Sequence, residues 1–78
     1  MDHYAGLDIS LEETSVCIVN GDGKVIRETK VPTDPDALAK ELLALKLDLK
    51  RVGLEASSLG GWLHAELSRR GFPAIVVE

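Results

Sequence analysis

The hydrophobic and polar positions of the N-terminal half predict three strands. Residues 4–10 and 14–20 are rich in apolar and β-branched side chains, and an Asn-Gly and an Asp-Gly dipeptide follow at residues 20–23. Both dipeptides favour the tight turn of a hairpin. Residues 24–31 alternate in character and carry charges, as an exposed edge strand does. The pattern therefore predicts an antiparallel meander.

Two helical patterns and two more strands follow. Residues 33–36, Thr-Asp-Pro-Asp, form a capping signature, and an apolar stripe of Leu38, Leu42, Leu45 and Leu49 predicts a helix that ends near residues 46–50. Residues 51–55 predict a short strand. A second helix is expected from a Ser57 or Ser58 cap to a left-handed Gly71, with Pro73 preventing its continuation. Residues 73–78 are almost wholly apolar and predict a last strand.

This order of elements predicts an α/β fold with a mixed five-stranded sheet. Numbered along the chain, the strands are expected in the order 3-2-1-4-5, with strands 1 and 4 parallel. Right-handed crossovers then place both helices on one face. Because strands 2 and 5 are apolar on both sides, the other face is expected to be covered by a homo-oligomer, by element exchange or by chain that follows residue 78.

Length, cysteine content and charge indicate a small intracellular domain. The 78 residues fit one small domain, 1–78, and the single cysteine, Cys17, fits a reducing, cytoplasmic compartment. Neither a membrane span nor a signal peptide is expected. With 13 Asp and Glu against 9 Lys and Arg, the net charge of −4 argues against tight nucleic-acid binding by this stretch alone.

Three phrases carry a resemblance to a known family: Tyr-Ala-Gly-Leu-Asp-Ile-Ser at 4–10, Glu-Thr-Ser-Val at 13–16 and Val-Gly-Leu-Glu-Ala-Ser at 52–57. With the element order, they resemble the N-terminal, RuvC-like part of DEDD transposases of the insertion sequence 110 type, relatives of the pilin-gene-inverting recombinases. The resemblance spans essentially the whole chain and implies a ribonuclease H-like fold.

The resemblance also implies an activity and a site. Asp8 matches the first Asp of the four acidic residues and Glu55 matches the Glu, whereas the two later aspartates and a C-terminal domain with a strand-transfer serine lie beyond this N-terminal fragment. The resemblance implies Mg²⁺- or Mn²⁺-dependent cleavage and transfer of DNA strands during transposition. The implied partners are DNA and, for at least some members of the family, a guide RNA. Alone, this stretch is expected to be inactive, and the metal is expected only with the missing acidic residues.

Strand geometry independently favours a site at Asp8 and Glu55. Both end parallel strands that are predicted neighbours, so their carboxylates should meet at one rim of the sheet. Two such oxygen donors suit Mg²⁺ or Mn²⁺. Local alternatives are that Asp8 bonds its own backbone in a turn and that Glu55 complements a helix dipole. Ser10 and Ser57 accompany the carboxylates, either as supporting groups or as turn residues.

Two other classes of function stay open. One is a non-catalytic oligomerisation or regulatory module in which the carboxylates are relics. The other is the N-terminal segment of an actin-like or sugar-kinase ATPase, which also places Gly-x-Asp on a three-stranded meander. In such an ATPase the hairpin between the first two strands binds a phosphate, and the side chain of Leu11 would crowd that phosphate.

Overall fold

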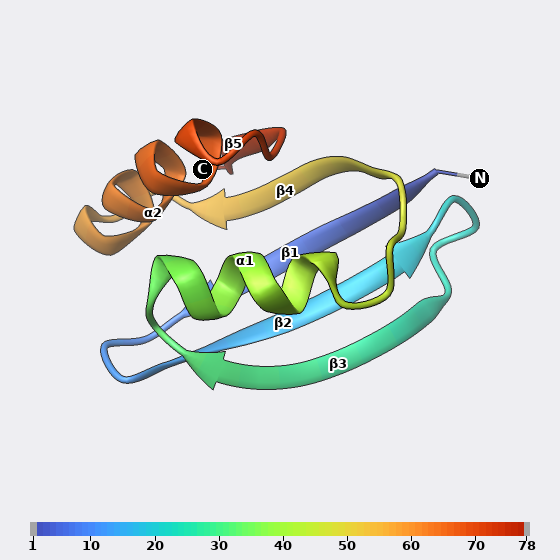
Figure 1. The fold of residues 1–78 in the computed structure, drawn as a ribbon, viewed down its shortest axis with the longest axis horizontal. Coiled ribbons are helices and arrows are strands. Elements are labelled where there is room, and N and C mark those ends of the chain that lie inside the picture. Colours follow the sequence, from blue (N-terminus) through green and yellow to red (C-terminus); the bar gives the residue numbers. More distant parts are fainter. Residues whose placement is uncertain (1, 78) are drawn as a thin grey trace.

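The computed structural model describes residues 2–77 and contains five strands and two helices (Figure 1). In chain order these are β1 (His3–Ile9), β2 (Glu13–Asn20), β3 (Val25–Pro32), α1 (Pro35–Leu43), β4 (Leu49–Glu55), α2 (Ser58–Arg69) and β5 (Ala74–Val77).

The strands form one mixed sheet in the order β3-β2-β1-β4-β5. Strand β2 is antiparallel to both of its neighbours, whereas β1 and β4, and β4 and β5, run parallel. The predicted α/β class, the strand order and the parallel pairing of β1 with β4 are therefore confirmed. The central strand β1 lies between the antiparallel half and the parallel half of the sheet.

Both helices pack on the same face of the sheet, as predicted from the handedness of the crossovers (Figure 1). One core cluster joins alternate residues of the central strands to the leucines of both helices. Its members are Ala5, Leu7, Ile9, Val16, Ile18, Leu38, Leu42, Val52, Leu54, Leu63 and Leu67. The opposite side of the sheet, called here the open face, carries no helix within residues 2–77.

The β2–β3 hairpin contains a bulge that decides which β3 side chains reach the open face. The Asn20 Oδ1 atom accepts hydrogen bonds from the backbone N–H groups of Asp22 and Lys24, and Gly23 adopts a φ of 80°. The pairing register shifts between Ile18 and Val19. This extra residue in β3 changes the alternation of the strand.

Helix α1 begins as predicted but ends earlier. The Asp34 side chain accepts a hydrogen bond from the N–H of Ala37, which caps the helix. The expected end near residues 46–50 is wrong, because the helix stops at Leu43 and Lys46 turns the chain with a φ of 52°. Beyond the helix, Leu47 and Leu49 still pack against the core from the connection and from β4, so the apolar pattern outlasts the helix.

Helix α2 has the predicted caps. The Ser57 hydroxyl accepts from the N–H of Gly60, and Gly71 follows the last turn with a φ of 90°. The N–H groups of Gly71 and Phe72 donate to the carbonyls of Ser68 and Leu67. These two bonds form a Schellman motif, which directs the chain back into β5.

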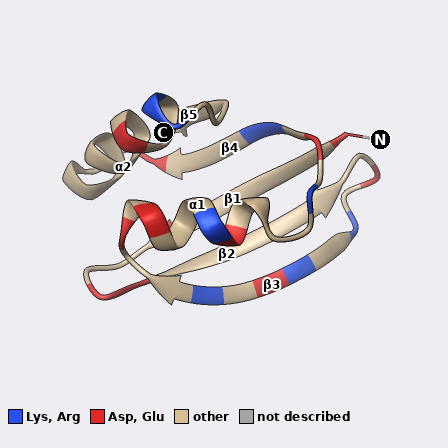
Figure 2. Cartoon of the chain, viewed as in Figure 1, with Lys and Arg blue, Asp and Glu red and all other residues tan. Residues whose placement is uncertain are grey.

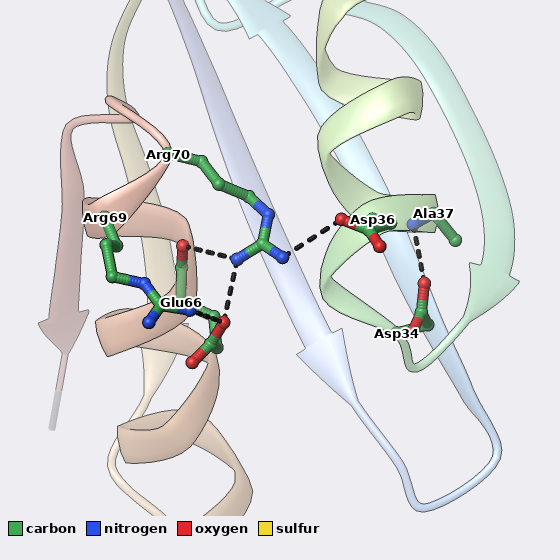
Figure 3. A network of polar contacts seen from close by, with 6 residues as sticks. All are labelled: Asp34, Asp36, Ala37, Glu66, Arg69 and Arg70. Atoms are coloured by element: carbon green, nitrogen blue, oxygen red, sulfur yellow. Dashed lines mark hydrogen bonds and ion pairs between the residues drawn. The ribbon is translucent and has the colours of Figure 1, made fainter.

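An ion-pair network joins the two helices (Figure 3). The Glu66 Oε1 atom lies 2.6 Å from Nη2 of Arg69 and 2.8 Å from Nη1 of Arg70. The other nitrogen of the Arg70 fork, Nη2, lies 3.0 Å from Oδ1 of Asp36 in the first turn of α1. The hydrogen bond from Arg70 lowers the pKa of Glu66, and the bonds to Glu66 and Asp36 raise the pKa of Arg70.

Glu66→Gln is therefore expected to lower the melting temperature near neutral pH. Because the pKa of Glu66 is lowered on folding, its charge stabilises the folded state above the ordinary glutamate pKa. That stabilisation is lost as the pH falls through the lowered value, and the variant and the parent should then converge. Thermal melts at neutral and strongly acidic pH measure this. Glu12→Gln, at an exposed loop position, is the control, and a Glu66→Gln effect that does not depend on pH would contradict the assignment.

Candidate functional site

Asp8 and Glu55 occupy corresponding positions on two adjacent parallel strands. The β1–β4 register pairs Gly6 with Gly53 and Leu7 with Leu54, and Asp8 and Glu55 are the next residues along the two strands. Neighbouring strands lie about 5 Å apart, so the two backbones are close at this end of the sheet. Both residues are exposed.

Both side chains belong to the open face. Leu7 and Ile9 on β1, and Leu54 on β4, are buried beneath the helices, and side chains alternate along a strand. The pairing registers extend this assignment over the whole sheet. The open-face residues are Tyr4, Gly6, Asp8, Ser15, Cys17, Val19, Val25, Glu28, Lys30, Arg51, Gly53, Glu55, Ile75 and Val77.

The backbone of Glu55 is held by α2 and β5. Glu55 pairs with Val77, and the N–H of Ala56 donates to the Val77 carbonyl at 3.2 Å. A Cβ on Gly60 would lie 2.0 Å from the Glu55 carbonyl oxygen, so the first turn of α2 packs directly on this peptide. The end of β4 is therefore fixed while the Glu55 side chain stays exposed.

Two hydroxyl groups fix the chain just after Asp8. The Thr33 hydroxyl donates to the Ser10 carbonyl at 2.7 Å, and the fully buried Thr14 hydroxyl lies 2.9 Å from that of Thr33. The single hydroxyl hydrogen of Thr33 is used in the bond to the Ser10 carbonyl, so the Thr14 hydroxyl donates to the Thr33 oxygen. This chain of bonds ties the β1–β2 connection to the segment that enters α1.

The two carboxylates themselves have no protein partner within residues 2–77. No hydrogen bond or ion pair there involves the side chain of Asp8 or Glu55. Asp8 lies in regular strand pairing, opposite Ser15, so it is not placed as a turn residue that bonds its own backbone. Glu55 precedes the α2 cap by two residues, and the cap itself is the Ser57 hydroxyl.

The serines that accompany the carboxylates have different positions. Ser57 is exposed and its hydroxyl caps α2 through the N–H of Gly60 at 3.0 Å. Ser10 is exposed, and its backbone N–H donates to the Glu13 carbonyl. The contacts of both residues thus stabilise the turns that end β1 and β4.

The donor set fits part of a divalent metal site. In the described part of the chain, no group of three or more His, Cys, Asp or Glu side chains is placed to hold a metal ion. Two carboxylates agree with the way Mg²⁺ is usually bound, through one or two carboxylates, several waters and the phosphate of a substrate. Asp8 and Glu55 are two carboxylate donors of the kind such an ion takes.

A groove on the open face was not predicted from the sequence. It has a volume of about 340 Å³ and lies over β2 and β3, lined by Ser15, Val16, Cys17, Glu28, Thr29 and Lys30. Four of these, Ser15, Cys17, Glu28 and Lys30, direct their side chains to the open face. Period-two alternation in both strands was visible in the sequence, but the pairing register was not.

Charges of both signs are distributed over the molecule (Figure 2). Figure 2 shows Lys and Arg on β3, α1, β4 and α2, with acidic residues on or beside the same elements. This mixture agrees with the net charge of −4 and contrasts with the concentrated basic stripe of a strong nucleic-acid binder.

Comparison with known proteins gives no family assignment: no family model matches the chain, and no curated protein matches it. Within residues 2–77, neither helix is long and apolar enough to cross a membrane.

Proposed function

We propose that this chain is the N-terminal part of the ribonuclease H-like catalytic domain of a DEDD transposase. In this proposal Asp8 and Glu55 are two of four acidic ligands for Mg²⁺ or Mn²⁺. The observation that carries it is the shared position of the two carboxylates at the ends of adjacent parallel strands, on the open face. The strand order and the sequence phrases around Asp8 and Glu55 support the same family.

The chemistry follows from the carboxylates. Bound divalent ions would activate the attacking oxygen and stabilise the leaving oxygen of a DNA phosphodiester. Asp8 and Glu55 provide two negative charges on rigid strand ends, so they hold ligand oxygens in place without a large loss of chain entropy on binding. Because only two of the four acidic ligands are present, residues 1–78 are expected to bind the ion weakly and not to cleave DNA by themselves.

A non-catalytic assembly role is the second candidate, and a specific feature of the open face favours it. Ile75 and Val77, at the β5 edge, are 39% and 53% exposed. Apolar side chains in such positions are often covered in an assembly. The expectation that a second copy or further chain covers this face stays a prediction.

The metal site is tested by Mn²⁺ titration with Asp8→Asn and Glu55→Gln. Mn²⁺ should broaden the amide resonances of residues near both strand ends in the parent protein. Each substitution keeps the side-chain size and removes one anionic ligand, and each should weaken binding about tenfold. The measurement is paramagnetic line broadening in two-dimensional amide spectra.

Two acidic residues outside the site serve as matched controls. Asp22→Asn changes an aspartate in the β2–β3 hairpin, and Glu12→Gln changes an exposed glutamate in the β1–β2 connection. Both should leave the broadening near Asp8 and Glu55 unchanged. Equal weakening by all four variants, or no localised broadening in the parent, would contradict the proposed metal site.

A further inference from the structure

One row of side chains on the open face connects Lys30 with the proposed metal ligands Asp8 and Glu55. The pairing registers place Lys30 of β3 opposite Ser15 of β2, and Ser15 opposite Asp8 of β1. Glu55 of β4 takes the next place in this row. Two strand spacings, about 10 Å, separate the backbones of Lys30 and Asp8.

The groove lies on this row. Its lining includes Ser15 and Lys30, and Ser15 pairs with Asp8 on the next strand. Ser15, which lies between Lys30 and Asp8 in this row, has a small side chain. The groove volume of about 340 Å³ is of the size that holds a small group rather than a protein element.

Lys30 is available to a ligand. It is exposed, and within residues 2–77 it takes part in no ion pair. Its ammonium group is a mobile point charge on a long stem, suited to a phosphate oxygen. Glu28 also lines the groove, but it lies one row away, opposite Cys17. Its negative charge disfavours an anion in that row, so an anion in the groove is expected to bind in the row of Lys30.

We infer that Lys30, with the Ser15 hydroxyl beside it, binds a backbone phosphate of a nucleic-acid strand. The neighbouring phosphate of the same strand then binds the metal at Asp8 and Glu55. The strand then crosses β1, β2 and β3 along this row. This inference rests on the proposed function, because the metal provides one of the two attachment points. It places a positive charge in the row that contains the carboxylates of Asp8 and Glu55.

Edge strands also carry lysines simply to discourage pairing with other sheets. That role requires neither a groove nor a metal, so the two explanations differ in how binding responds to Mn²⁺. Lys24→Gln is a matched control, since Lys24 is an exposed lysine immediately before β3, at the end of the strand away from Lys30.

The experiment measures binding of a short fluorescein-labelled oligothymidylate by fluorescence anisotropy, with Mn²⁺ or with a chelator. In Mn²⁺, Lys30→Gln should weaken binding of the oligonucleotide about three- to tenfold. The slope of the logarithm of the binding constant against the logarithm of the salt concentration should become less steep by about 0.7, as expected for the loss of one phosphate contact to a single strand. Lys24→Gln should change neither quantity appreciably. In the chelator, Lys30→Gln and Lys24→Gln should be alike.

The outcomes separate this inference from the proposed function. If Mn²⁺ still broadens the resonances near Asp8 and Glu55 but Lys30→Gln binds like Lys24→Gln, the Lys30 contact is wrong and the metal site stands. If the parent shows no Mn²⁺ binding, both are wrong. An equal Lys30→Gln effect with and without Mn²⁺ would also overturn the inference, because it would reflect general attraction.

Discussion

Gly60→Ala is expected to lower the free energy of unfolding by about 3 kcal/mol. The added Cβ would lie 2.0 Å from the Glu55 carbonyl oxygen and 3.1 Å from the Ser57 hydroxyl. The first obstacle is backbone and cannot rotate away, so α2 or the end of β4 must move. A domain of this size has only a few kcal/mol of stability, so much of it should be lost. Chemical denaturation followed by circular dichroism measures the change.

The adjacent glycine provides the control. Gly61 lies in the same turn of α2, is exposed, and has no atom within 4 Å of an added Cβ. Gly61→Ala should therefore stabilise the protein by about 0.5–1 kcal/mol through the helix propensity of alanine. Similar losses for both variants would show that the contact with Glu55 does not determine the effect.

The Gly60 variant also connects packing with the site. The atom that the added Cβ would meet is the carbonyl oxygen of Glu55. Any movement that relieves this clash therefore shifts Glu55, whose side chain is one of the proposed metal ligands. Glycine is required here for close approach of helix and strand, whereas Gly61 has no such requirement. Of these two adjacent glycines, only Gly60 lies in close contact with the backbone of β4.

The strand order could be predicted because several local signals agree with it. The Asn-Gly and Asp-Gly dipeptides at 20–23 indicated the hairpin, and Gly71 and Pro73 indicated the end of α2. Right-handed crossovers then left few arrangements for the remaining strands. Agreement among turns, caps and alternation made the topology predictable.

The end of α1 could not be predicted from periodicity. Leu45 and Leu49 continue the helical spacing, but Leu45 is 40% exposed and Leu49 begins β4. The connection contains no Gly or Pro, and its turn depends on a positive φ at Lys46. Apolar residues after a helix can pack against the same core, so spacing alone does not show where the helix stops.

The candidate site was predictable only in part, for a similar reason. Two neighbouring parallel strands sufficed to bring Asp8 and Glu55 to one edge. The Lys30 position depends instead on the register shift between Ile18 and Val19. Without that bulge the register would slip by one residue and would place Lys30 opposite Thr14, on the helix side. A sequence pattern does not reveal such a bulge.

Leu42→Ala is expected to lower the free energy of unfolding by about 2–5 kcal/mol. Leu42 is 2% exposed and belongs to the core cluster that α1 shares with the central strands. Removal of its side chain leaves a cavity between the helix and the sheet in a thin core. Urea denaturation measures the loss.

The next residue is a matched control for this substitution. Leu43 has the same side chain, also lies in α1, and is 62% exposed. Leu43→Ala should change stability by less than about 0.5 kcal/mol, because little apolar area returns to water and alanine is the better helix former. Burial on one side of α1 is then the only large difference between the two variants. Comparable losses at both positions would show that the burial of Leu42 does not determine the effect.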